Sequence, residues 1–283
     1  MTRLARALLA GCLPVLASSP LLAHPAVSVV VDKGGTVYYS DTERVWTIAP
    51  DGTRRVAVPD VHTHEVWLDA DGTLYGEHLW YDGEAANTWG HRVWKRAPNG
   101  AVSVVIPNRK GFLQDHRDFT FARDAQRHLY WVEGSRPARV MTRATPGASP
   151  EVLATMAFTN QSWLSVTRDG TCYVSEGGVV WRIRRGAAAE RLPDALSRSR
   201  ERLAVMGMAS GPDGALYVAA YEDGAVRRLS LSGQVTTVAT TPRDWKPTGV
   251  AVAPDGALWV LEASSTNAQR VRRIAPDGSS RIF

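Results

Sequence analysis

Cysteine and lysine are scarce in this chain, and no long hydrophobic run occurs. The 283 residues include two cysteines, too few for a disulfide-stapled scaffold. Apolar residues make up 44% of the chain, which excludes a disordered protein. No apolar run reaches the roughly 18 residues that a membrane-spanning helix needs, so no transmembrane span is expected.

Charge of one sign does not dominate either. The 33 basic and 28 acidic residues leave a net charge of +5, and the basic residues are not gathered in a block. A nucleic-acid partner is therefore not expected. The chain also lacks a Gly-x-Ser-x-Gly elbow, a phosphate-binding loop and a Cys-x-x-Cys pair. The common signatures of nucleophilic, nucleotide and zinc-knuckle chemistry are thus missing.

The first 23 residues have the pattern of an export signal. Arg3 and Arg6 precede an apolar stretch, and Leu21-Leu22-Ala23 forms a cleavage site before His24. The pattern predicts a signal peptide over 1–23, a periplasmic or secreted protein, and one mature domain over 24–283. An alternative is a lipid anchor on Cys12, because Leu9-Ala10-Gly11-Cys12 is similar to a lipoprotein cleavage box.

One pattern recurs six times along the mature chain. Each copy is a turn followed by an alternating strand that carries an aromatic residue. The spacings between successive aromatics are 37, 55, 43, 44 and 42 residues. The copies are GGTVYYSD at 34–41, DGTLYGEH at 71–78, HLYWVE at 128–133, DGTCYVSE at 169–176, DGALYVAA at 213–220 and DGALWVLE at 255–262.

These repeats predict an all-β fold. Alternating strands with turn residues every eight to twelve positions are typical of antiparallel sheet. Four strands repeated six times at about 40–45 residues predict a six-bladed β-propeller of four-stranded antiparallel blades, which we expect to be monomeric. The Asp-Gly turn, the Tyr/Trp strand and the Arg-Val start of the third strand resemble NHL repeats. Gluconolactonase-like and peptide-amidating-lyase propellers are wider relatives of this shape.

Turn chemistry predicts which residues face one another. In 253–257, Pro254 and Gly256 suit a three-residue loop between Ala253 and Ala257, with Gly256 left-handed. The same rule predicts one pair per blade on the face opposite these turns, with Cβ atoms about 4.5–5.5 Å apart. The pairs are Val27/Asp41, His64/His78, Arg117/Glu133, Ser162/Glu176, Met206/Ala220 and Thr248/Glu262. We expect Asp41, Glu176 and Glu262 to hold loops by hydrogen bonds.

Blade two departs from this pattern. His78 replaces the acidic residue, and its predicted partner is His64. Fourteen positions separate His78 from Arg92, whereas three separate Asp41 from Arg44. The extra residues predict a long loop on this face, including Trp80 and Trp89, and long loops are often functional.

We therefore place the candidate site on blades two and three. The expected ligand-binding residues are Glu65, Trp80, Trp89, Arg117 and Glu133, with Glu77 adding charge at the rim. His64 and His78 could share a divalent metal, Zn²⁺ or Ca²⁺, with a third ligand such as His116. The alternative is a hydrogen-bonded histidine pair that packs between blades.

Two functions fit these expectations. The first is a binding protein for a small molecule, a glycan or a protein partner. The second, implied by the resemblance, is a metal-assisted hydrolase or lyase. The metal sets of the two families are not reproduced. Ser162, Met206 and Thr248 stand where amidating lyases carry histidine, and only Asn160 lies near a gluconolactonase ligand position.

Overall fold

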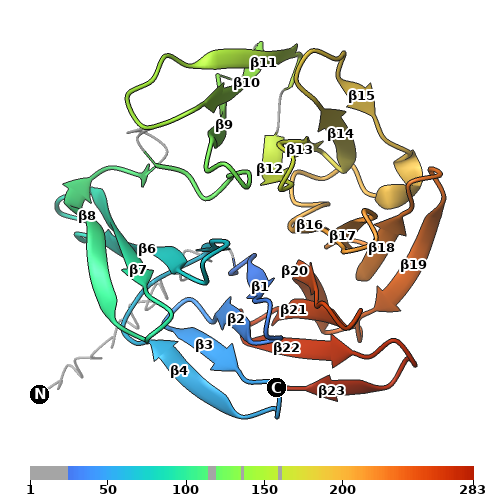
Figure 1. Ribbon diagram of the computed structural model, residues 1–283, viewed down its shortest axis with the longest axis horizontal. Helices are drawn as coiled ribbons and strands as arrows, with labels where there is room; N and C mark the ends of the chain where they lie inside the picture. The colour runs from blue at the N-terminus through green and yellow to red at the C-terminus, as the bar shows by residue number, and fades with distance from the viewer. Residues whose placement is uncertain (1–24, 114–118, 135–136, 159–160) are drawn as a thin grey trace, which may run out of the picture.

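The computed structural model describes residues 25–113, 119–134, 137–158 and 161–283. Six antiparallel sheets stand around a ring, and each follows the previous one along the chain (Figure 1). The predicted all-β, six-bladed propeller is therefore confirmed. The predicted signal peptide and Cys12 lie outside the described residues, so export remains a prediction. In the described part of the chain, no helix has the length and apolar character to cross a membrane.

The strands run in chain order from the inside of each blade to the outside. Blade one contains β1 (Val29–Val31), β2 (Val37–Ser40), β3 (Val45–Ile48) and β4 (Arg54–Val58). Blade two contains β5 (Val66–Leu68), β6 (Leu74–Tyr81), β7 (Trp89–Arg96) and β8 (Val102–Lys110). Blade three contains β9 (Leu129–Glu133), β10 (Ala138–Arg143) and β11 (Glu151–Met156).

The second half of the ring repeats this order. Blade four contains β12 (Gln161–Val166), β13 (Cys172–Glu176), β14 (Val179–Ile183) and β15 (Glu190–Arg191), followed by the short 3-10 helix η1 (Asp194–Leu196). Blade five contains β16 (Met208–Ser210), β17 (Leu216–Ala220), β18 (Ala225–Leu229) and β19 (Val235–Thr240). Blade six contains β20 (Trp245–Val252), β21 (Leu258–Ser264), β22 (Gln269–Ile274) and β23 (Ser280–Ile282).

Blade three is the irregular member. Its sheet has three strands, and the segment Phe119–Arg123 runs along β9 in the place of an innermost strand. Tyr130 N–H donates to the carbonyl of Ala122, and Arg123 forms an isolated bridge with Leu129. The inner edge of this blade is therefore built from less regular chain than that of its neighbours.

The predicted turns are confirmed. Ala253 N–H donates to Ala257 O at 2.8 Å, and Gly256 N–H donates back to Ala253 O at 2.9 Å. Gly256 has φ +81°, a left-handed conformation in which a Cβ would be strained. Asp69 and Thr73 in blade two form the same turn, in which Asp69 N–H donates to Thr73 O at 2.9 Å.

Two of the predicted opposing pairs are wrong by one residue. The structure pairs Glu176 with Gln161 rather than Ser162, and Glu262 with Pro247 rather than Thr248. In both blades the register shifts near the inner end of the hairpin. A β-bulge inserts one extra residue there, which the turn rule does not contain.

Of the thirteen residues between His78 and Arg92, six continue the strands and seven form the turn, so only about half of the predicted long loop is loop. Trp80 pairs with Gly90 and Tyr81 pairs with Trp89, so that only residues 82–88 form the turn. A Cβ at Gly90 would lie 2.2 Å from the Trp80 ring, so the indole lies over the glycine. The Tyr81 and Trp89 rings also contact each other, with centroids 5.0 Å apart. Such cross-strand aromatic contacts extend the hairpin.

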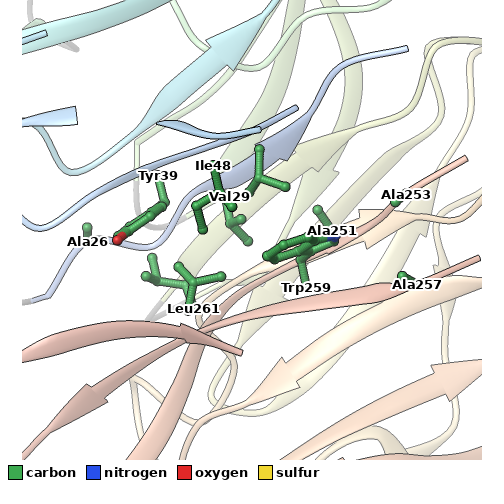
Figure 2. Packing of buried hydrophobic residues seen from close by; sticks show 11 residues of the cluster. Ala26, Val29, Tyr39, Ile48, Ala251, Ala253, Ala257, Trp259 and Leu261 are labelled. Atoms are coloured by element: carbon green, nitrogen blue, oxygen red, sulfur yellow. The ribbon is translucent and has the colours of Figure 1, made fainter. Parts of the chain in front are cut away.

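Side-chain packing closes the ring between blades one and six. The four strands of blade six come from one contiguous stretch of the chain. Buried residues of blade six pack against those of blade one in a common hydrophobic cluster (Figure 2). Trp259 is 5% exposed, and Tyr39 and Leu261 are fully buried. A Cβ at Gly249 would lie 2.6 Å from the carbonyl oxygen of Val27, so glycine allows the two inner segments to approach.

Replacing Trp259 with alanine should weaken the packing between blades one and six. We expect Trp259→Ala to lower the free energy of unfolding by about 3–5 kcal/mol, because a large buried ring leaves a cavity. Leu231→Ala is the control, since Leu231 is 79% exposed and should cost little. Urea unfolding of both variants measures the difference, and an equal loss in the two would contradict a closure that depends on packing.

Candidate functional site

Blades two, three and four surround a cavity of about 590 Å³. Six short sequence segments, and Arg202 from a distant loop, supply its wall. The lining residues are His64, Glu65, Glu77, Leu79, Phe112, Leu113, Phe119, Thr120, Phe121, Ala122, Tyr130, Trp131, Val132, Trp163, Leu164 and Arg202. One side of the wall is acidic and the rest is largely aromatic.

Glu77 is the most deeply buried carboxylic acid that lines the cavity. It lies on β6, and its backbone carbonyl accepts hydrogen bonds from Thr63 Oγ1 and from Trp94 Nε1, the latter at 2.9 Å. These bonds fix the main chain from which the side chain extends to the cavity. The residue is 9% exposed.

Glu65 lies beside it on the segment that leads into β5. Burial raises the pKa of Glu65 to about 7. Burial, and then the charge of Glu65, raise the pKa of Glu77 to about 8. The two carboxyl groups are thus close enough to interact, and the charge of one disfavours ionisation of the other.

Three histidines adjoin the acidic wall. The sequence predicted that His64 faces His78, but the register shifts beyond Val66, where Leu79 N–H donates to His62 O. His62 therefore stands between the other two. Its backbone N–H donates to His78 Nδ1 at 3.0 Å, and its Nε2 lies 2.9 Å from His64 Nε2. Burial, Arg92 and His62 lower the pKa of His78, which favours a neutral ring.

This histidine arrangement favours packing over shared metal binding. Across the described ranges, no three His, Cys, Asp or Glu side chains are grouped closely enough to hold a metal ion. The described residues therefore do not supply a ligand set for the metal that the resemblance implies. His116, the predicted third ligand, lies outside the described residues, so the set His64, His78 and His116 remains a prediction.

The predicted aromatic residues flank the cavity without lining it. Trp80 stacks on His78 with ring centroids 6.0 Å apart. Trp89 stacks on Phe112 at 5.6 Å, and Phe112 in turn lines the cavity. Trp89 thus contacts a lining residue, whereas His78, which Trp80 contacts, is not among the lining residues.

Of the two remaining predicted residues, Glu133 is described and Arg117 is not. A carboxylate oxygen of Glu133 lies 2.6 Å from Arg139 on the neighbouring strand. Its predicted partner Arg117 is outside the described residues. Of the predicted residues that the structure describes, His64, Glu65 and Glu77 line the cavity directly.

Of the other acids of this face, Asp41 holds its loop by hydrogen bonds as predicted, whereas Glu262 pairs with two arginines of β22 and not with a loop. Asp41 accepts hydrogen bonds from the backbone N–H groups of Glu43 and Arg44 and from Trp46 Nε1. Glu262 is fully buried between Arg270 and Arg272.

The sequence did contain a signal for Glu77. The corresponding positions of the other five repeats hold small or apolar residues, namely Ser40, Val132, Ser175, Ala219 and Leu261. A carboxylate at a position that is otherwise uncharged is a departure of the same kind as His78. The aromatic residues Phe119, Trp131 and Trp163 carried no such signal, since they are indistinguishable in sequence from blade packing.

Comparison with known proteins agrees with this architecture. A virginiamycin B lyase from Nocardia farcinica is 35% identical over 98 residues, which span 33% of this chain and about a third (34%) of that relative. The crystal structure of virginiamycin B lyase from Staphylococcus aureus superposes with a TM-score of 0.51 over 92% of this chain and 84% of that one, at 14% identity. The chain shares the six-bladed propeller fold of these proteins.

A gluconolactonase from Xanthomonas campestris has the same fold. It superposes with a TM-score of 0.55 over 87% of this chain and 86% of that one, at 12% identity. The expected likeness to gluconolactonase-like propellers is thus confirmed for the fold. No protein-family model matches the chain, and the NHL character of its repeats stays a prediction.

The raised pKa of Glu77 predicts a pH-dependent stability. Its pKa is 4.5 in ordinary surroundings and about 8 in the folded protein, so the folded state binds the proton more tightly. This stabilisation is present at low pH and is lost as the pH rises through 8. Glu77→Gln should therefore be more stable than the wild type at pH 9, by on the order of 2 kcal/mol, with a smaller difference at pH 5.

Urea unfolding of both proteins at the two pH values measures this effect. Glu84→Gln, on the exposed turn 82–88, is the control and should follow the wild type. A difference between Glu77→Gln and wild type that does not change with pH would show that the carboxyl group is not protonated in the fold.

Proposed function

We propose that the protein binds a small molecule in the cavity between blades two, three and four. The observation that carries this proposal is the cavity itself, which has about 590 Å³ and receives polar and aromatic side chains from separate blades. Cavities of several hundred Å³ with mostly apolar walls and a few convergent polar groups are typical of small-molecule sites. A flat protein-binding surface would not need such a depth.

The walls give such a ligand two kinds of contact. Phe119 and Phe121 form an edge-to-face pair with centroids 5.3 Å apart, and Arg123 lies over Phe119 at 3.9 Å. These contacts fix the aromatic wall in advance, which reduces the entropy lost on binding. Glu65 and Glu77 supply the polar contacts that orient the ligand.

Filling the cavity tests this proposal. Leu79→Trp should abolish binding of aromatic fragments, because the larger side chain would occupy the space that Leu79 now lines. The matched control is Leu153→Trp, which fills a second cavity, of about 670 Å³, lined also by His128 and Arg184. Ligand-observed NMR with a fragment library is the measurement. Binding that survives Leu79→Trp, or no binding to the wild type at millimolar concentrations, would refute the proposal.

A second function at the same cavity is lyase or hydrolase chemistry by general acid–base catalysis. The observation that favours it is the pair of raised pKa values, about 7 for Glu65 and about 8 for Glu77, since catalytic groups work best near ambient pH. A protonated Glu77 can donate a proton while an ionised Glu65 accepts one. The partial similarity to virginiamycin B lyase makes virginiamycin B the first substrate to examine.

Incubation of the purified protein with virginiamycin B, followed by mass spectrometry, tests this chemistry. We expect turnover by the wild type and a loss of about 100-fold or more in Glu77→Gln, because the proton donor is removed. Glu84→Gln should retain the wild-type rate. Turnover that is unchanged in Glu77→Gln would exclude Glu77 as the acid.

A further inference from the structure

Glu77 differs from every other buried carboxylic acid in the described chain. Four such side chains are buried, and three have a strong partner. Asp69 lies 2.5 Å from Arg127, and Asp124 accepts from His128 Nδ1 at 2.7 Å and from Tyr130 at 2.9 Å. The fourth, Glu262, is held between two arginines.

No described donor or cation satisfies the carboxyl group of Glu77. Its backbone carbonyl is bonded, but the side chain makes no hydrogen bond or ion pair within the described ranges. An unpaired carboxylate with nine-tenths of its surface buried is costly, and native proteins rarely leave one without a partner. Here the side chain faces an open cavity, so a ligand can supply the partner.

Among the described residues, the charges around Glu77 do not balance the acidic wall. Glu65 and His64 share the wall with it, and Arg202 is the basic side chain among the lining residues. Arg202 is exposed to solvent. The pKa of Glu77 is raised by burial and by the charge of Glu65. The remaining titratable group on the wall, Tyr130, is neutral because burial and Asp124 raise its pKa.

We propose that this cavity binds an organic cation, with its ammonium or guanidinium group between Glu65 and Glu77 and its apolar part against Trp163 and Phe112. The proposal rests on the small-molecule function proposed above and names its ligand class. Aromatic faces attract cations as well as apolar groups, so both walls favour the same ligand.

Binding of the cation is non-covalent. The positive group of the ligand pairs with the carboxylates of Glu77 and Glu65, and no bond of the ligand forms or breaks.

Three benzyl compounds test the charge preference. The probes are benzyltrimethylammonium, benzyl alcohol and benzoate, which carry positive, zero and negative charge on a similar frame. Calorimetry with the full wild-type chain at pH 9 should show binding of the cation that is about tenfold tighter than binding of benzyl alcohol or benzoate.

Substitutions then assign the effect to Glu77. Glu77→Gln should weaken binding of benzyltrimethylammonium about tenfold at pH 9, while Glu84→Gln should match the wild type. Glu65→Gln is the second variant, and it should also weaken binding of the cation. Unchanged circular dichroism shows that each variant is folded.

The outcomes separate this inference from the function on which it rests. Equal binding of benzyl alcohol and the cation, unaffected by Glu77→Gln, would overturn the cation preference and leave the small-molecule function standing. Binding of Ca²⁺ in place of the organic cation, lost in the same variant, would also overturn it. If none of the three probes binds the wild type, both proposals fail.

Discussion

Every blade of this protein has two faces, and each face needs a neighbour to cover it. A four-stranded antiparallel sheet with apolar residues on both sides is not stable alone in water, so the blades are stable only when they pack against one another in the ring. The ring is contiguous along the chain except at one junction, where blade six meets blade one. There Trp259 and Tyr39 pack in a common core, and Gly249 lets the inner backbones approach.

The cavity exists because the inner edges of the blades are not equally close to one another. Blades one, five and six bring their inner segments close together, and a Cβ at Gly207 would lie 2.7 Å from the Thr248 carbonyl. Blade three instead places the irregular segment Phe119–Arg123 along β9. Its aromatic rings border an open space toward blades two and four, into which Glu65 and Glu77 extend.

Burial of two acids that have no cationic partner among the described residues links stability to function. Burial costs Glu77 less free energy when the group is protonated, which is why burial raises its pKa. A proton donor and a site for a positive ligand can arise from the same arrangement. Beside these acids, His62 contacts both other histidines, because its backbone N–H donates to His78 Nδ1 and its Nε2 lies 2.9 Å from His64 Nε2.

The sequence by itself determined the architecture of this protein. The recurring turn and aromatic strand specify a blade, and six copies specify the ring, because these signals are local and repeat along the chain. The same local rules predicted the turn at Gly256 and drew attention to Glu65 and His64. Tertiary structure decided the rest. The β-bulges that shift the pairs of Glu176 and Glu262 depend on how inner strands meet at the axis. The cavity depends on residues far apart in sequence, and the burial of Glu77 exists only once blades two, three and four enclose it, since desolvation is a property of the surroundings and not of the residue.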